Sequence, residues 1–121
     1  MKTIVVVDDN KMFLETLKDF VEGINKDFKC IAFLNPDDAL RYVIDEKEIH
    51  AVVSDYEMPQ MDGLTLAKKI MEVLPVTKII VMSGHDTNYL RKHTLKAGID
   101  ESQICFLCKS DIINLCSLLN S

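Results

Sequence analysis

The stretch IVVVDD, residues Ile4–Asp9, places four branched apolar residues directly before two acids. A continuous apolar run of this length is typical of a strand that is buried on both faces of a parallel sheet. The two acids follow at the point where such a strand would leave the sheet. This stretch therefore predicts an α/β fold with charged side chains at the carboxyl edge of its sheet.

The same unit of an apolar run followed by a helical pattern recurs along the whole chain. Strands are predicted at 4–7, 30–34, 51–53, 79–82 and 104–107. The intervening segments have apolar residues at helical spacing, at 13–24, 39–44, 64–74, 89–95 and 112–119, and the fourth helix is expected at about 86–97. Five strands thus alternate strictly with five helices.

Helix ends are marked by residues with known capping preferences. Asn35 before Pro36 predicts one helix start, and Asp62 and Ser110 are expected to cap two others. Gly98 is expected to end the fourth helix in a left-handed conformation.

Strict alternation predicts a parallel sheet with helices on both faces, joined by right-handed crossovers. The expected fold is a flavodoxin-like, doubly wound five-stranded sheet in the order 2-1-3-4-5. Ligands bind such sheets at the carboxyl ends of the strands, where the strand order reverses between strands 1 and 3.

Size and composition narrow the class of protein. A chain of 121 residues corresponds to one domain, taken as residues 1–121. Fourteen basic and nineteen acidic residues give a net charge of -5, which argues against direct nucleic-acid binding. No apolar run approaches the roughly 20 residues of a membrane span, so a cytoplasmic protein without membrane contact is expected.

Four cysteines fit a reducing compartment. Cys105 and Cys108 form a Cys-x-x-Cys, which could indicate a metal or redox site. They fall on a predicted strand, where residues three apart point to opposite faces. We therefore expect Cys30, Cys105, Cys108 and Cys116 to be buried, free thiols.

Polar residues stand at four of the five predicted strand ends: Asp8, Asp9, Asp55, Ser83 and Lys109. They should converge at the carboxyl edge. Three crowded carboxylates repel one another unless positive charge intervenes, and Lys109 supplies only one. A hard divalent cation such as Mg2+ is the natural complement, and Asp55 could then act as a nucleophile toward phosphorus.

Four motifs carry a resemblance to a known family. They are VVDDN at 6–10, VSDYEMPQMDG at 53–63, VMSG at 81–84, and AG at 97–98 with the later Lys109. In this order the chain resembles the two-component response-regulator receiver family over essentially its whole length.

The resemblance implies roles for individual residues. Asp55 matches the phosphoacceptor, and Ser83 and Lys109 match the hydroxyl and ammonium groups that contact the phosphoryl group. Asp8 and Asp9 match the acidic pair that holds Mg2+ together with Asp55.

Further positions are implied in the same way. The backbone carbonyl of Glu57 matches a metal ligand, and the side chains of Glu57 and His85 match positions that tune hydrolysis of the acyl phosphate. Phe106 matches an aromatic residue that switches with Ser83.

The implied partners are a sensor histidine kinase or phosphotransfer protein, which donates the phosphoryl group, and a downstream protein target. The target is expected to bind the face formed by helix 4, strand 5 and helix 5. The domain would catalyse only its own phosphorylation and dephosphorylation, either as a free-standing regulator or as part of a longer chain.

The chain departs from the family pattern near Lys109. The family usually has Lys-Pro there, whereas this chain has Lys109 followed by Ser110, and residues 100–103 form an apparent insertion. A cis bond before serine costs about 2.5–4 kcal/mol, so we predict a trans bond and a rebuilt turn.

Three alternatives remain at this point. A flavin-binding flavodoxin-like protein would need a phosphate loop after strand 1, where Asp8, Asp9 and Asn10 would repel phosphate. A receiver that acts as a fixed binding module is disfavoured by the intact polar set. A haloacid-dehalogenase-type phosphatase would need an Asp-x-Asp after a strand.

Overall fold

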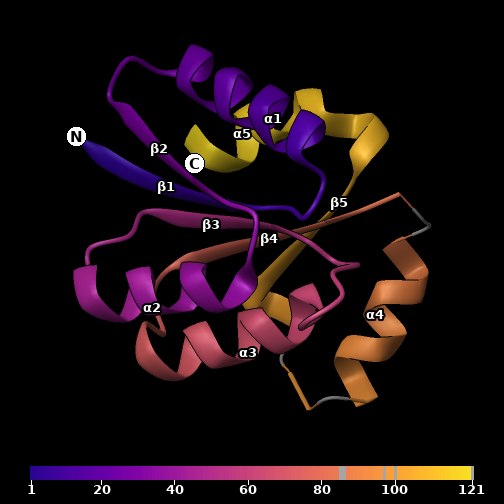
Figure 1. The fold of residues 1–121 in the computed structure, drawn as a ribbon. Helices are drawn as coiled ribbons and strands as arrows, with labels where there is room; N and C mark the ends of the chain where they lie inside the picture. The colour runs from indigo at the N-terminus through magenta and orange to yellow at the C-terminus, as the bar shows by residue number, and fades with distance from the viewer. Residues whose placement is uncertain (85–86, 97, 100, 121) are drawn as a thin grey trace.

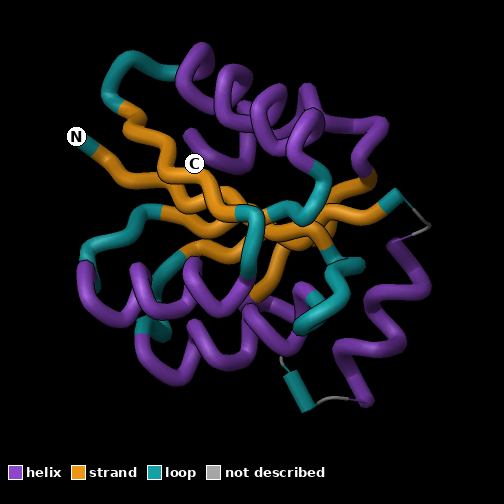
Figure 2. The backbone as a smooth tube through the Cα atoms, viewed as in Figure 1, coloured by secondary structure: helices purple, strands orange, loops and turns teal. Residues whose placement is uncertain are grey.

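The computed structural model describes residues 1–84, 87–96, 98–99 and 101–120. Five strands form one parallel sheet in the order β2-β1-β3-β4-β5, which confirms the predicted topology (Figures 1 and 2). Their bounds are Lys2–Val7 (β1), Phe28–Phe33 (β2), Ala51–Asp55 (β3), Lys78–Ser83 (β4) and Ile104–Cys108 (β5).

The helices lie in two layers on either side of the sheet. Their bounds are Lys11–Ile24 (α1), Pro36–Glu46 (α2), Gly63–Val73 (α3), Thr87–Lys96 (α4) and Leu115–Asn120 (α5), with short 3-10 helices at Glu101–Gln103 (η1) and Lys109–Asn114 (η2). Helices α1 and α5 cover one face, and α2, α3 and α4 cover the other (Figure 1). The helices among the described residues are all too short or too polar to span a membrane.

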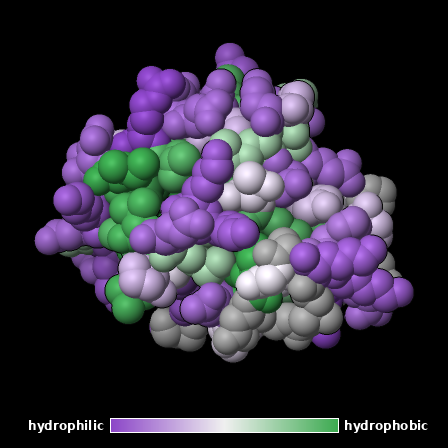
Figure 3. Space-filling view, turned by 90° about the horizontal axis from the view of Figure 1, so that it is seen from below, coloured by the Kyte–Doolittle hydropathy of each residue, from purple (hydrophilic) through white to green (hydrophobic). Residues whose placement is uncertain are grey.

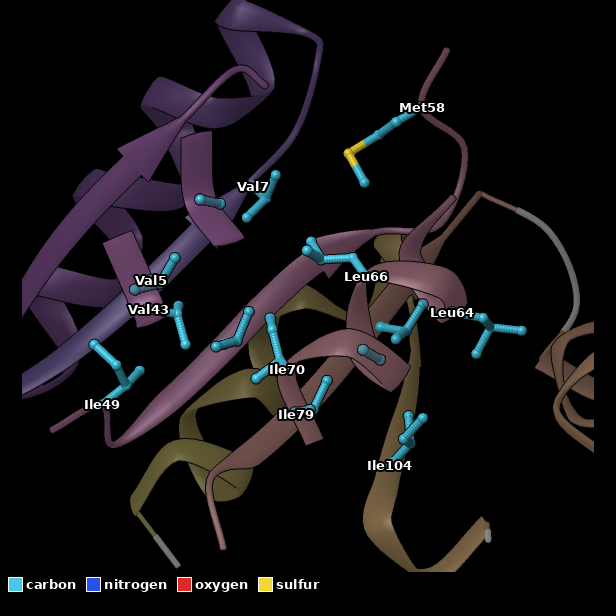
Figure 4. Packing of buried hydrophobic residues seen from close by; sticks show 14 of the residues in the cluster. Val5, Val7, Val43, Ile49, Met58, Leu64, Leu66, Ile70, Ile79 and Ile104 are labelled. Carbon is cyan, nitrogen blue, oxygen red and sulfur yellow. The ribbon is translucent and has the colours of Figure 1, made fainter. Parts of the chain in front are cut away.

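Two hydrophobic cores fill the space between the sheet and its helices. The core under α2, α3 and α4 includes Val5, Leu66, Ile70 and Ile79 (Figure 4). Ile4 and Val6 point to the opposite core, under α1 and α5. Because alternate residues of β1 enter different cores, the strand must be apolar throughout, which explains the run from which the fold was predicted.

Three helices begin at side-chain caps. The side chains of Asn10, Asn35 and Asp62 accept hydrogen bonds from Phe13 N–H at 3.1 Å, Asp37 N–H at 2.8 Å and Thr65 N–H at 2.8 Å. The caps predicted at Asn35 and Asp62 are thus confirmed. Gly98 has the expected left-handed conformation, with φ of +74°.

The prediction that Ser110 caps the fifth helix is wrong. The chain enters η2 at Lys109, and α5 begins only at Leu115. The Ser110 hydroxyl donates to Cys108 Sγ at 3.2 Å, five residues before α5 begins. Asp111, with φ of -102° and ψ of 29°, interrupts the helical backbone.

The cysteine prediction is confirmed in part. All four thiols are free, but only Cys30 is buried, whereas Cys105, Cys108 and Cys116 are half-buried. The last three lie in β5 and α5 at one side of the molecule, where the covering elements are short. Cys105 packs toward the core under α1 and α5.

Candidate functional site

The carboxyl ends of β1 and β3 bring three carboxylates together. One oxygen each from Asp8, Asp9 and Asp55 lies within 4.8 Å of the other two. Asp8 and Asp55 are buried, with 1% and 7% of their surface exposed, while Asp9 faces solvent. They line a pocket of about 300 Å³ together with Asn10, Glu57, Gly84 and Lys109.

Lys109 enters this pocket from the end of β5. Its Nζ lies 3.2 Å from Asp8 Oδ2 and 3.2 Å from Asp55 Oδ1. The peptide bond between Lys109 and Ser110 is trans, as predicted, and the side chain still reaches both acids. The rebuilt turn through η2 therefore leaves the ammonium at the acidic cluster.

The site shifts the pKa of both partners. Burial, reinforced by the charge of Asp8, raises the pKa of Asp55 to about 6, against the lowering effect of Lys109. Burial alone would lower the pKa of Lys109, but attraction to Asp55 and Asp8 outweighs it and the pKa is raised. At neutral pH, Asp55 is mostly ionised and Lys109 is charged.

The charges in the pocket do not balance without a further cation. Four carboxylates line the pocket against one ammonium, and three of them, those of Asp8, Asp9 and Asp55, bring oxygens close together, the ligand atoms that Mg2+ prefers. The exposed Asp9 leaves the cluster open to solvent on one side. The residues present thus fit a hard divalent cation that keeps some of its water.

Backbone contacts hold the loop after Asp55 in place. Tyr56 N–H donates to the Met82 carbonyl at 2.8 Å, and Gly63 N–H donates to the Tyr56 carbonyl at 2.8 Å. A Cβ on Gly63 would lie 2.5 Å from the Asp55 carbonyl oxygen, closer than real Cβ contacts allow. The glycine of the motif is therefore required because α3 begins against the backbone of the acceptor residue.

The other predicted residues are less close to the acids. Ser83 is buried at the end of β4, beside Gly84, and is not among the lining residues of the pocket. Glu57 lines the pocket and is exposed. Phe106 is half-buried against the core under α2, α3 and α4. His85 lies outside the described residues.

Sequence reasoning missed two neighbours of the acids. The Phe13 ring, on the first turn of α1, lies under Lys109 with Nζ 4.5 Å from its centroid. Asn10 donates its N–H to Asp8 Oδ1 at 2.8 Å and also caps α1. The Asp9–Asn10 pair directly precedes a helical pattern, so Asn10 could have been predicted as an N-cap. The sequence around Phe13 gives no sign of its contact with Lys109, which lies 96 positions away.

Comparison with known proteins identifies the family to which the chain is similar. Residues 4–109 match the family model described as response regulator receiver domain. The chain is 31% identical over 100 residues to the uncharacterized transcriptional regulatory protein YesN of Bacillus subtilis, and 31% identical over 99 residues to the response regulator protein TmoT of Ectopseudomonas mendocina.

These matches cover 82% and 78% of this chain but only 27% and 42% of the two relatives. The chain therefore spans less than half the length of either protein. Among solved structures, a response regulator receiver domain protein from Clostridium thermocellum superposes with a TM-score of 0.83. That match covers 99% of this chain and 92% of the other at 21% identity, and shows a shared fold.

Proposed function

Because the chain belongs to the response regulator receiver domain family, we propose that it accepts a phosphoryl group on Asp55 and thereby switches a protein-binding surface. The observation that carries this proposal is the juxtaposition of Asp8, Asp9 and Asp55 with Lys109 at one sheet edge. Family membership supports the phosphoaccepting role. The geometry offers a candidate nucleophile, candidate groups that stabilise the phosphoryl group, and candidate metal ligands.

Asp55 is the proposed nucleophile. It is fixed at the end of a fully buried strand, and its raised pKa still leaves it mostly ionised at pH 7. A carboxylate oxygen forms a bond to phosphorus while the bond from phosphorus to the donor nitrogen breaks, and the electron pair leaves with that nitrogen. Later attack of water on phosphorus returns the free carboxylate and inorganic phosphate.

Lys109 and Ser83 are proposed to stabilise the transferred group. The Lys109 ammonium already lies 3.2 Å from Asp55 Oδ1, so it can remain paired to a phosphoryl oxygen without a large movement. Ser83 lies buried at the end of the neighbouring strand β4, and we propose that its hydroxyl turns toward the phosphoryl group to donate a hydrogen bond. That turn, followed by movement of the half-buried Phe106, is the proposed switch.

Asp8, Asp9 and Asp55 would hold Mg2+, together with the backbone carbonyl of Glu57. When bound, the ion would offset negative charge on the carboxylates and on the phosphoryl oxygens. The protein's own contribution is to keep two of the acids buried and in place, through Asn10 N–H and Lys109 Nζ on Asp8. The side chains of Glu57 and His85 are proposed to tune the attack of water.

The proposed phosphodonor is a sensor histidine kinase or a phosphotransfer protein. The proposed downstream target is a protein that reads the face formed by α4, β5 and α5. The domain would thus act as a signalling switch whose chemistry is confined to its own phosphorylation and dephosphorylation.

The test is to incubate the protein with acetyl phosphate and Mg2+ and to measure its intact mass. We expect the added mass of one phosphoryl group, absent in Asp55→Asn and slower to appear in Asp9→Ala or in EDTA. Asp45→Asn, which removes an exposed acid on α2, is the matched control and should be labelled like the native chain. Undiminished labelling of Asp55→Asn would refute the assignment.

A further inference from the structure

Three aromatic rings join the loop after Asp55 to α4. Tyr56 directly follows Asp55, while Tyr89 and His93 stand four positions apart on α4 and so share one face of that helix. The centroid of the Tyr56 ring lies 6.3 Å from that of Tyr89 and 6.4 Å from that of His93. The Tyr89 and His93 rings lie 4.3 Å apart at an interplanar angle of 61°. We call Tyr56, Tyr89 and His93 the aromatic cluster.

Few of the described side chains of α4 are buried. They are Leu90, which belongs to the core under α2, α3 and α4, and Thr94, whose hydroxyl donates to the Leu90 carbonyl at 2.8 Å. In Figure 3, which looks onto α2, α3 and α4, the side where α4 lies is predominantly hydrophilic. The contacts of Tyr89 and His93 with Tyr56 therefore form a second attachment of α4, made at the residue next to the acceptor.

The backbone of Tyr56 lies between two residues of the proposed reaction. Asp55 precedes it at the end of β3, and its N–H donates at 2.8 Å to the carbonyl of Met82, the residue before Ser83. Its own carbonyl accepts from Gly63 N–H at 2.8 Å. Tyr56 thus shares a peptide bond with Asp55 and a hydrogen bond with the peptide group that links Met82 to Ser83. A backbone change at either residue would shift the ring that α4 contacts.

The ring contacts can break without disturbing the core. Tyr56 and His93 are half-buried, and 50% of the Tyr89 surface is exposed. The two half-buried residues border a hollow of about 460 Å³, which is also lined by Lys68 and Lys96. Because protein atoms do not fill this hollow, the rings can separate without displacing a buried side chain. An aromatic pair shifts an equilibrium by roughly two- to tenfold, which suits a contact that opens and closes.

We propose that the aromatic cluster couples the position of α4 to the phosphorylation state of Asp55, an inference that rests on the proposed function. In the unphosphorylated protein the Tyr56 ring holds Tyr89 and His93, and with them α4, in the position seen in the structure. When Asp55 is phosphorylated, the Tyr56 backbone shifts and the rings separate. Helix α4 is then released at the proposed signalling face, which is formed by α4, β5 and α5. By reciprocity, a partner that binds the released α4 favours the phosphorylated state.

This link differs from the switch proposed for Ser83 and Phe106. Phe106 lies on β5, whereas the aromatic cluster begins beside the acceptor and ends on α4. The two devices therefore act on different elements of the same face, and Tyr56 is a positioning residue for α4.

Hydrogen exchange of the backbone amides of residues 87–96, measured by mass spectrometry on the whole chain, tests the proposal. Each protein is measured with and without acetyl phosphate and Mg2+, and the intact mass of the same sample reports its phosphorylation. Tyr89→Ala/His93→Ala removes both α4 rings and leaves the acceptor loop unchanged. Tyr89→Phe/His93→Phe retains two rings, and Arg91→Ala/Lys92→Ala is the matched control at exposed positions of the same helix.

In the native chain we expect phosphorylation to speed exchange in α4 by about three- to tenfold. In Tyr89→Ala/His93→Ala, exchange should already be as fast without acetyl phosphate, and phosphorylation should change it by less than about twofold. Alanine has a higher helix propensity than tyrosine or histidine, so faster exchange in this variant cannot come from propensity. The phenylalanine variant and the Arg91→Ala/Lys92→Ala control should respond as the native chain does.

A native chain that gains the phosphoryl mass without a change in α4 exchange would overturn this inference and leave the proposed function intact. A response of Tyr89→Ala/His93→Ala equal to that of the native chain would also overturn it, because the rings would then only cover apolar surface. If the double variant does not fold, Tyr89→Ala alone should respond less than the native chain, and an equal response would again overturn the inference. No gain of mass in the native chain would refute the proposed function and this inference with it.

Discussion

Gly63 is the residue at which the backbone of α3 comes closest to the acceptor. A Cβ there would lie 2.5 Å from the Asp55 carbonyl oxygen and 3.0 Å from Tyr56 Cα. Both are backbone atoms, so they cannot move aside as the end of a side chain could. The demand for glycine comes from this close approach, since Gly98 alone among the described glycines has a positive φ.

Gly63→Ala should therefore destabilise the protein by about 1–3 kcal/mol and slow phosphorylation, because the loop that holds Asp55 must shift. Gly23→Ala is the control. It lies inside α1 with nothing within 4 Å of the new Cβ, and should stabilise by about 0.5–1 kcal/mol through helix propensity. Urea denaturation measures both changes. A Gly63→Ala variant with the same free energy of unfolding as the native protein would contradict this prediction.

Asp55 gives the protein a pH-dependent stability. Its pKa is raised from 3.8 to about 6 in the folded state, so the folded protein holds this proton more tightly than the unfolded chain. The resulting stability is present below about pH 4 and is lost as the pH rises through 6. Without divalent cations, Asp55→Asn should therefore stabilise the protein by up to about 3 kcal/mol at pH 8.

The gain should shrink as the pH falls through 6 and approach zero only below pH 4, where the carboxyl of Asp55 becomes protonated in the unfolded chain as well as in the folded protein. Urea midpoints in EDTA at several pH values measure it. Asp45→Asn, on the exposed face of α2, should show no comparable trend. A gain that is the same at pH 4 and pH 8 would exclude the charge of Asp55 as its cause.

Phe13 is expected to position Lys109. The Lys109 ammonium lies 4.5 Å from the centroid of this ring and 3.2 Å from one oxygen each of Asp8 and Asp55. A cation–π contact of about 0.5–1 kcal/mol would be lost in Phe13→Leu, which corresponds to a phosphorylation rate about two- to fivefold lower. Phe13→Tyr keeps an aromatic face and should restore the rate. If Phe13→Leu and Phe13→Tyr are phosphorylated at the same rate as each other, the ring has only a packing role.

For single residues, the local sequence predicted the positions of the three aspartates and Lys109, because each follows an apolar run. It also predicted the caps at Asn35 and Asp62, because each precedes a helical pattern. Phe13 could not be predicted in the same way. Its contact with Lys109 joins α1 to the end of β5, and only the folded sheet brings these segments together.

Among the elements, α5 depends most on the rest of the molecule. It has six residues, too few for a helix to be stable alone. Its last carbonyls are held by distant basic side chains: Lys78 Nζ donates to the Leu118 carbonyl at 2.6 Å, and His50 Nε2 lies 3.1 Å from the Leu119 carbonyl. These contacts link the end of α5 to β4 and to the residue that precedes β3.

Lys78→Met should lower the free energy of unfolding by about 1–2 kcal/mol, because the stem is kept while a charged donor to a partly buried carbonyl is lost. Lys29→Met, at an exposed position of the edge strand β2, is the control and should change stability by less than about 0.5 kcal/mol. Thermal and urea unfolding report the difference. An unchanged midpoint for Lys78→Met would mean that α5 is held by its apolar face alone.

The error in the fifth helix shows where element prediction failed. Ser110 precedes an apolar helical pattern, which is the usual sign of an N-cap. The turn after Lys109 instead continues as η2, and the hydroxyl bonds to Cys108. Lys109, the first residue of this turn, lies 3.2 Å from oxygens of Asp8 and Asp55, contacts that the local sequence does not reveal.

At the scale of the whole molecule, the strand order and both helical layers followed from the alternation of elements and from the handedness of crossovers. The hollow lined by Lys68 of α3 and Lys96 of α4 did not, because it depends on how α4 packs against its neighbour. The sequence of residues 86–97 has the least distinct helical pattern of the five, with Tyr89, Leu90 and Leu95 as its large apolar residues. That pattern could not reveal that lysines of both α3 and α4 would border the resulting space.

The four cysteines differ in burial, so they should differ in their reactivity toward thiol reagents and can serve as labelling sites. Thiolates are the species that alkylating reagents attack, and burial, with the charge of Glu22, raises the pKa of Cys30 to about 12. In the native protein Cys30 should be silent, so a maleimide dye would label only β5 and α5, at Cys105, Cys108 and Cys116. Fluorescence from these sites would follow movement of the proposed signalling face without an engineered handle, and labelling of Cys30 would count unfolded molecules.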